Sequence, residues 1–224
     1  VEQFDLVVLG TGAGGSAPAL KCRAAGWRVA IIDDQPYGGT CAVRGCDPKK
    51  VLVGAAQLVS WHHRMHGHGV AGDGNIDWPE LMRFKRTFTD PVPINTESAF
   101  TKAGIETLHG EATFIAEDRL RLESQEIVAK HVVIATGSGP RPLNIPGESR
   151  LITSTQSLVL DRLPRRILFV GVGCVSLEFA PVARLAGCGV ILMGSVTPIP
   201  SFAATLFVRC FGPYRATGIP GACD

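Results

Sequence analysis

The sequence has little net charge, few aromatic residues and no long hydrophobic run. Its 22 Lys and Arg against 20 Asp and Glu leave a formal charge of +2, and aromatic residues make up 7%. A balanced charge without runs of one sign gives no indication of a nucleic-acid partner. The longest apolar run, ILFVGVGCVSL, stops before Glu178 and is too short to cross a bilayer. Neither nucleic acid nor a membrane is therefore a predicted partner.

Regularly spaced cysteines are also missing. The 224 residues include seven cysteines, but their spacing is not that of a secreted disulfide scaffold. The apolar segment LVVLG follows an acidic start and carries no cleavage pattern, so it predicts a strand and not a secretory signal. In a cytosolic protein, two close cysteines indicate redox or metal chemistry more than a structural staple. We therefore expect a cytoplasmic protein.

Hydrophobic periodicity predicts strands alternating with helices in the first half of the chain. FDLVVLG and WRVAIIDD predict buried parallel strands. Helical patterns follow at residues 17–25 and 48–60, and residues 77–103 predict a helical arm broken by two prolines. This order is typical of a nucleotide-binding α/β domain.

The second half begins with short alternating segments. EATFIA, RLRLES and EIVAK predict an antiparallel meander that leads into the buried strand KHVVIATG. A second strand-loop-helix start, RRILFVGVGCVSLEFA, and the strand GVILMG follow, and after about residue 198 the pattern fits no element. We therefore predict an α/β fold with two tandem Rossmann-like βαβ nucleotide-binding domains, the meander between them and the second incomplete. We place the domains at residues 1–150 and 151–224.

A glycine-rich loop, Gly10-Thr-Gly12-Ala-Gly14-Gly15, joins the first predicted strand to the first helix. Such a loop permits the tight turn, the approach of a pyrophosphate to the helix N-terminus and close helix–strand packing. A lone GxGxxG is a weak signal, but the second strand ends in Asp33, where a ribose-binding carboxylate belongs. The combination favours dinucleotide binding over an ordinary tight turn. Pro18 departs from the pattern, because it should kink the helix.

A second loop, Gly171-Val-Gly173-Cys-Val-Ser176, has serine in place of the third glycine. That change loosens helix packing slightly and leaves the phosphate turn intact. After the next strand, an NADH site carries an acid and an NADPH site carries Arg. This chain has Met193, Gly194 and Ser195 there, so the sequence does not distinguish the two.

The stretch GGTCAVRGCDPKK places Cys41 and Cys46 five residues apart. In a straight helix, five residues rise about 7.5 Å and their side chains diverge by about 140°, whereas a disulfide needs Cα atoms within about 7 Å. A bridge therefore requires a distorted helix start, which Gly45 permits. The same position favours thiolate, because helix N-termini and nearby Lys lower a cysteine pKa.

Two other interpretations of the cysteines are zinc binding and ordinary buried thiols. Structural zinc sites usually have a gap of about two to four residues and a second matching pair, which the sequence lacks. A cluster of histidines, His62, His63, His66 and His68, is typical of a polar helix exit more than of a metal site. No metal is therefore predicted.

Together, the first glycine loop, GGTCAVRGCDPKK, IATGS and the second loop with Glu178 resemble the FAD-dependent pyridine nucleotide–disulfide oxidoreductases, most of all the glutathione reductase and mercuric reductase branch. GGTCxxxGCxPKK is highly specific, and the four motifs keep the family's order over roughly residues 3–193. The resemblance implies FAD on the first domain and a redox-active Cys41–Cys46 disulfide against one flavin face. It implies electron transfer from NAD(P)H through both to a disulfide or related acceptor.

The resemblance also implies a role for each matching residue. Cys46 would be the flavin-proximal thiol that forms the charge-transfer thiolate, and Cys41 the thiol that attacks substrate. Lys49 would lie by flavin N5, where a cation stabilises reduced flavin, and pair with Glu178. The implied cofactor-binding residues are Gly10, Gly12, Gly14, Gly15 and Asp33 for the FAD pyrophosphate and ribose, Gly39, Thr40, Lys49, Ala135, Thr136 and Gly137 around the flavin, and Gly171, Gly173 and Glu178 in the second loop.

The sequence departs from this family in its length. It ends near half the family's usual length, so we expect a C-terminally truncated chain, from an early stop or a shifted reading frame. The expected losses are the second half of the NAD(P) domain and the C-terminal interface domain. In the family that domain supplies the homodimer interface and a His–Glu acid/base pair.

The predicted substrate site departs as well. Ala13, Leu20 and, in a looser alignment, Thr96 stand where glutathione reductases carry Ser, Arg and Tyr. Cys174 stands where an aromatic gate often covers the nicotinamide pocket. The expected substrate is a small-molecule or protein disulfide. Two alternatives remain open: a non-catalytic nucleotide-binding fragment, and a flavin monooxygenase or oxidase, which shares GxGxxG but not the cysteine pair.

Overall fold

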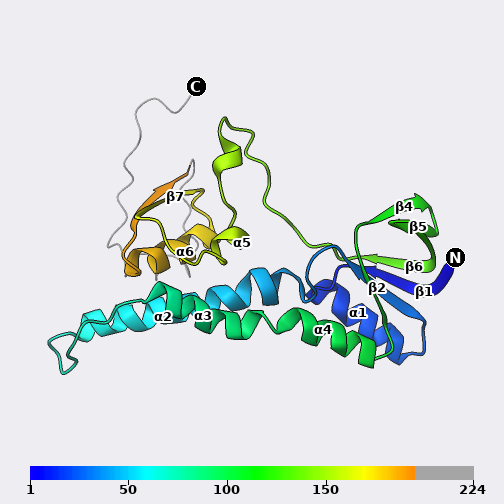
Figure 1. Cartoon of the computed structure of the whole chain (residues 1–224), viewed down its shortest axis with the longest axis horizontal. Helices are drawn as coiled ribbons and strands as arrows, with labels where there is room; N and C mark the ends of the chain where they lie inside the picture. Colours follow the sequence, from blue (N-terminus) through cyan, green and yellow to red (C-terminus); the bar gives the residue numbers. More distant parts are fainter. Residues whose placement is uncertain (195–224) are drawn as a thin grey trace. The chain divides into compact units, whose positions relative to one another are not determined.

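The structure is a computed structural model that describes residues 1–194. The chain divides into two compact units (Figure 1). The first comprises Val1–Pro48 and Phe84–Val159, and the second comprises Lys49–Arg83 and Leu160–Asp224. Each unit contains its own sheet.

A six-stranded sheet of order β3-β2-β1-β6-β5-β4 forms the centre of the first unit. Four strands pair in parallel: β1 (Glu2–Leu9), β2 (Val29–Asp33), β3 (Glu106–His109) and β6 (Gln125–Ile134). Two more, β4 (Ala112–Ala116) and β5 (Arg119–Leu122), extend the sheet from β6 as an antiparallel meander. The long strand β6 therefore joins the parallel and antiparallel parts.

Both faces of β1 are buried. On one face Val7 and Leu9 pack with apolar residues of β2, β5 and β6. On the other, Leu6 and Val8 pack with residues of α1 (Ala13–Ala24) and α4 (Val92–Lys102), two helices that lie along the sheet in Figure 1. Burial on both faces is typical of parallel strands and explains why these strands are nearly continuous apolar runs.

The chain leaves β2 through a π-helical turn, η1 (Thr40–Arg44), and enters α2 (Cys46–Met65). The helical arm consists of α3 (Trp78–Thr89) and α4, separated at Pro91, as predicted. A 3-10 turn η2 (Glu148–Arg150) and a short helix α5 (Ser154–Ser157) complete the first unit.

In the second unit, the parallel strands β7 (Arg166–Val170) and β8 (Gly189–Met193) are connected by α6 (Cys174–Leu185). Much of this helix is buried, including Leu177, Phe179 and Val182. The unit also contains α2 from Lys49 onward and α3 up to Arg83. It therefore has the strand-helix-strand start that the sequence predicted.

The structure confirms the predicted fold class and corrects several elements. EIVAK and KHVVI form one strand, β6, because it pairs with β5 on one edge and β1 on the other. Strand β3 was missed, since its sequence ETLH carries a single large aliphatic residue. Helix α2 extends past Ser60 to Met65, and α1 is one helix through Pro18.

The compact units divide the chain differently from the predicted domains. The segment Lys49–Arg83 groups with the residues after Leu160, and the first unit runs to Val159. The functional domains at residues 1–150 and 151–224 stay a prediction. Ser195 and the tail after residue 198, which fit no predicted element, lie outside the described residues.

Candidate active site

The first glycine loop is packed so closely that it has no room for side chains at two of its positions. Gly10 has a φ of +105°, and a Cβ there would overlap the carbonyl oxygen of Ala135. A Cβ on Gly15 would overlap the carbonyl oxygen of Gly10 and lie 3.0 Å from Val8 Cγ1. Helix α1 follows directly, with Gly12 as an N-cap that makes no side-chain hydrogen bond. Its N-terminal N–H groups are suited to bind a phosphate.

Asp33, at the end of β2, braces this loop. One carboxylate oxygen accepts hydrogen bonds from the backbone N–H of Thr11 at 2.8 Å and from its hydroxyl at 2.5 Å. The other accepts the N–H of Gln35 at 2.9 Å, and Thr11 Oγ1 accepts the N–H of Gly38 at 3.1 Å. The sequence singled out Asp33 but missed Thr11. Thr11 occupies a variable position of GxGxxG, so the motif gave no signal for this role.

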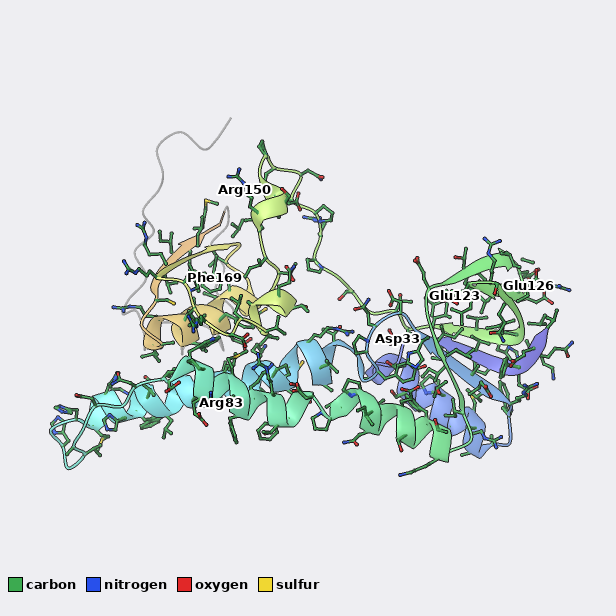
Figure 2. The ribbon with its side chains drawn as sticks, in the orientation of Figure 1. Asp33, Arg83, Glu123, Glu126, Arg150 and Phe169 are labelled. Carbon is green, nitrogen blue, oxygen red and sulfur yellow. The ribbon has the colours of Figure 1, made fainter. Side chains whose placement is uncertain are left out.

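A cleft of about 330 Å³ opens beside Asp33, which is labelled in Figure 2. It lies where the carboxyl ends of β1 and β2 meet the start of β4, the usual place for a ligand in a parallel sheet. Its lining includes Gly10, Asp33, Asp34, Gly110, Glu111 and Thr136. Gly110, Glu111 and Asp34 are further candidates that the sequence did not reveal. Gly110 and Glu111 were missed because β3, which they follow, was not predicted.

Ala135, Thr136 and Gly137 follow β6 in the same unit. The N–H of Ala135 donates to the carbonyl of Leu9 at 2.8 Å, and Thr136 lines the cleft. Gly137 has a φ of +78° and is exposed. The structure therefore brings this segment together with the first glycine loop.

The loop between β2 and α2 also approaches the glycine loop. A Cβ on Gly39 would overlap Gly12 Cα, so the backbones at these two positions touch. Gly39 has a φ of +70° and is buried, whereas the next residue, Thr40, is exposed. The loop that leads to Cys41 thus contacts the glycine loop that is suited to phosphate.

Cys41 and Cys46 lie on either side of a distorted helix start. Cys41 is in the π-helical turn η1, and Cys46 is the first residue of α2. Gly45 separates the two segments, and a Cβ there would lie 2.9 Å from the carbonyl oxygen of Thr40. The structure confirms the predicted distortion at Gly45. Both cysteines are exposed free thiols.

The pKa of Cys41 lies above its usual range. The largest cause is a hydrogen bond to the side chain of Cys46, followed by desolvation and by the charges of Cys46 and Asp47. The two sulfurs are therefore neighbours in the dithiol form. The expectation that this position lowers the pKa is wrong for Cys41, because the hydrogen bond to Cys46 stabilises its protonated form.

Lys49 and Glu178 form an ion pair within the second unit. Lys49 Nζ bonds to a carboxylate oxygen of Glu178, and their side chains are 23% and 17% exposed. Lys49 lies on α2, one turn after Cys46, and Glu178 lies on α6, one turn after its first residue, Cys174. The predicted pairing of these two residues, made across 129 positions of sequence, is present.

The second glycine loop is more open than the first. Gly171 has a φ of +104°, and Gly173 is the N-cap of α6. A Cβ on either residue would meet no atom of residues 1–194 within 4 Å. Cys174, the first residue of α6, is an exposed free thiol. The backbone therefore has the turn that suits a phosphate without the close packing of the first loop.

Among residues 1–194, no group of three or more His, Cys, Asp or Glu side chains could hold a metal ion. His62 Nδ1 accepts the N–H of Gly74 at 3.1 Å, and His63 Nε2 lies 2.7 Å from the carbonyl oxygen of the same glycine. These two histidines hydrogen-bond the loop after α2 to the helix. No helix in this part of the chain is long and apolar enough to span a membrane.

The residues of the first unit fit FAD. The helix N-terminus at Gly12 is suited to a pyrophosphate, and the excluded Cβ positions at Gly10 and Gly39 show how closely the surrounding backbone packs. The cleft beside Asp33 carries carboxylates suited to ribose hydroxyls. Its volume is within the range of small-molecule sites.

The match to known proteins covers most of the chain. The chain is 31% identical over 203 residues to dihydrolipoyl dehydrogenase from Chlamydia pneumoniae, and the alignment covers 88% of this chain and 44% of the relative. It is 30% identical over 185 residues to glutathione reductase from Nostoc sp., with coverages of 82% and 40%. The chain thus spans less than half the length of these relatives.

A solved structure has the same fold. A mutant of the flavoprotein disulfide reductase RclA from Escherichia coli, in a Cu(II) complex, matches with a TM-score of 0.79 and 25% identity, covering 94% of this chain and 48% of that one. Enzymes named in these matches belong to a class that is FAD-dependent and uses NAD(P)H. Residues 4–204 match the pyridine nucleotide-disulphide oxidoreductase family, and the chain belongs to this family.

Proposed function

We propose that this chain carries the FAD-binding and redox-active part of a disulfide reductase. Electrons would pass from NAD(P)H through FAD and the Cys41–Cys46 pair to a disulfide acceptor. The observation that carries this proposal is the placement of two exposed thiols, Cys41 and Cys46, on either side of the distorted start of α2. Both thiols lie in the same compact unit as the glycine loop, Asp33 and its cleft.

Each part of the first unit has a task in this proposal. Gly12 and the start of α1 would hold the FAD pyrophosphate, Asp33 its ribose, and Thr40 and residues 135–137 the flavin. The bound FAD would supply two-electron transfer between the nicotinamide and the cysteine pair. In the second unit, the loop Gly171–Ser176 would bind the NAD(P) pyrophosphate.

The chemistry of the cysteines is thiol–disulfide exchange. Deprotonated Cys41 attacks one sulfur of the acceptor, the acceptor S–S bond breaks, and a first thiol leaves. Cys46, as thiolate, then attacks the Cys41 sulfur and releases the second thiol. The dithiol is oxidised to a disulfide, and the acceptor gains two electrons and the two protons that the cysteines lost.

The raised pKa of Cys41 sets a condition on the first step. At neutral pH the thiol needs a base to remove its proton, because the thiolate is the nucleophile. We therefore propose that rapid turnover depends on a base that accepts the proton of Cys41.

The remaining parts of the proposal concern partners and location. The acceptor would be a small-molecule or protein disulfide, and the working protein a homodimer. The cytoplasm fits two exposed thiols, since the cytosol keeps thiols reduced.

The test is flavin stoichiometry combined with a reduction titration of the 224-residue protein. We expect binding of one FAD per chain and uptake of four electrons per flavin, two by FAD and two by the cysteine pair. Cys41→Ser and Cys46→Ser should each lower the uptake to two electrons. Cys22→Ser, which changes a half-buried thiol of α1, should leave it at four. Two electrons in the unaltered protein would refute the redox role of the pair.

A second candidate is a nucleotide-binding fragment without catalysis. The open packing of the second loop against residues 1–194 favours this alternative. It predicts FAD binding without NAD(P)H-driven reduction of a disulfide. Steady-state oxidation of NADH or NADPH with a disulfide by this chain would exclude it.

A further inference from the structure

Arg44 occupies an unusual position between the two cysteines. It is the last residue of the π-helical turn η1, three residues after Cys41 and two before Cys46. Its Nη1 atom is buried and is the one buried side-chain nitrogen or oxygen without a hydrogen-bond partner within the described part of the chain. Because Nη1 has less than 1 Å² of accessible surface, bulk water does not supply an acceptor either.

An orphaned guanidinium nitrogen carries a cost. Arginine stays protonated at any physiological pH and presents five N–H donors, so its charge cannot be removed by titration. Leaving a buried donor of a charged group unsatisfied is unfavourable. None of the ion pairs formed within residues 1–194 includes Arg44. An acceptor supplied by a ligand would remove this penalty.

The spacing of the turn places Arg44 on the same side of η1 as Thr40. Turns closed by bonds from residue i to i+5 contain about four to five residues. Thr40 and Arg44, four residues apart, therefore share a side of η1. Val43 faces elsewhere, because its Cγ2 lies 3.2 Å from the point where a Cβ on Gly38 would lie. A Cβ at that point would also meet Val92 of α4. Thr40 directly follows Gly39, whose backbone touches Gly12 at the phosphate-binding loop.

We propose that Arg44 binds an oxyanion at the redox turn, and that this oxyanion is a phosphate of the bound FAD. A guanidinium donates two parallel hydrogen bonds to a phosphate, which suits it to this task. The inference rests on FAD binding by the first unit. The other source of an oxyanion is an acidic group on the acceptor disulfide.

Two measurements on three variants test this inference. The first is the dissociation constant for FAD and for riboflavin, which has no phosphate, by flavin fluorescence on the apoprotein. Arg44→Met should weaken FAD binding by about 10-fold or more, because a charge-assisted hydrogen bond is lost. Its affinity for riboflavin should stay unchanged. Arg44→Lys should recover part of the FAD affinity, and Arg121→Met, which removes an exposed charge from β5, should match the unaltered protein.

The second measurement distinguishes the two sources of the oxyanion. It compares the rate at which the reduced chain reacts with the anionic disulfide dithiobis(nitrobenzoate) and with neutral dithiodipyridine. A loss in Arg44→Met confined to the anionic disulfide would assign the oxyanion to the acceptor. A loss confined to FAD affinity would assign it to the cofactor.

An Arg44→Met protein that keeps both properties, or loses FAD and riboflavin affinity equally, would overturn the inference. These outcomes are separate from failure of the proposed function. In that case the unaltered protein would not bind FAD at all.

Discussion

The two glycine loops share one motif but differ in what surrounds them. Gly10 and Gly171 have nearly the same φ, +105° and +104°. A Cβ on Gly10 would overlap a backbone carbonyl, whereas a Cβ on Gly171 would meet no atom of residues 1–194 within 4 Å. Within that part of the chain, the first loop lies at the end of four parallel strands, and the second at the end of two. The same strand-loop-helix motif therefore forms a closely packed turn in the first unit and, among the described residues, an open turn in the second.

This difference explains the serine in the second loop. At Gly15 the helix lies against the turn itself, so that no side-chain atom fits. At the corresponding position of the second loop, Ser176 carries a side chain on the first turns of α6 and is half-buried. A departure from the motif is thus tolerated where the packing that requires glycine is absent.

Placing serine at position 15 and, in a separate variant, glycine at position 176 should give the largest contrast in stability. Gly15→Ser forces a side chain into the carbonyl of Gly10, and we expect a loss of about 3 kcal/mol or more in the unfolding free energy of the first unit. Ser176→Gly should change stability by no more than about 1 kcal/mol, the usual cost of glycine within a helix. Urea unfolding of both variants measures the contrast. Similar losses in the two would show that the loops are packed alike.

Alanine at the first glycine of each loop separates packing from backbone strain. Because the φ values are nearly equal, Gly10→Ala and Gly171→Ala carry the same strain, about 1–2 kcal/mol. Only Gly10→Ala adds the overlap with Ala135. We expect it to cost about 2 kcal/mol more than Gly171→Ala by urea unfolding. Equal costs would mean that the dihedral angle accounts for the whole effect.

The coupling energies of ion pairs in the two units should differ by a smaller amount than these stability losses. Lys49–Glu178 is mostly buried, whereas Lys130–Asp5 in the first unit joins side chains that are 73% and 32% exposed. Double-mutant cycles with methionine for Lys and Gln or Asn for the acid should give a coupling of about 1 kcal/mol or more for the first pair. The second should give less than about 0.5 kcal/mol and lose it at high salt. Equal couplings would remove this distinction between the units.

The sequence predicted much of the fold because its signals are local. The apolar runs of β1, β2 and β7 and the two glycine loops each specify a strand or a turn without help from distant residues. Strand β3 was missed because ETLH becomes a strand only through pairing with β2, a tertiary contact. The single strand β6 was divided in two, because the exposed polar residues Lys130 and His131 interrupt its apolar pattern.

The candidate site was predicted mostly from motif spacing. The pairing of Lys49 with Glu178, far apart in sequence, came from the family resemblance and is present. The bracing of the loop by Thr11 and Asp33, and the part of Glu111 in the cleft, depend on how three separate strands end at one edge. The raised pKa of Cys41 depends on the orientation of one thiol toward another, and spacing alone does not determine it.

The smallest predicted effect concerns Cys41, a thiol that the first unit places beside a second thiol. Because the hydrogen bond to Cys46 raises its pKa, the pH profile of Cys41 alkylation by iodoacetamide should be displaced upward from that of free cysteine. Cys46→Ala removes that bond, and Cys41 in this variant should react several-fold faster near pH 7.5. Since the folded pKa is raised, the bond stabilises the reduced chain below the unfolded thiol pKa of about 8.5 and is lost as pH rises through the folded value. Peptide mapping by mass spectrometry resolves Cys41 from Cys174, and unchanged reactivity in Cys46→Ala would show that the pair is not coupled.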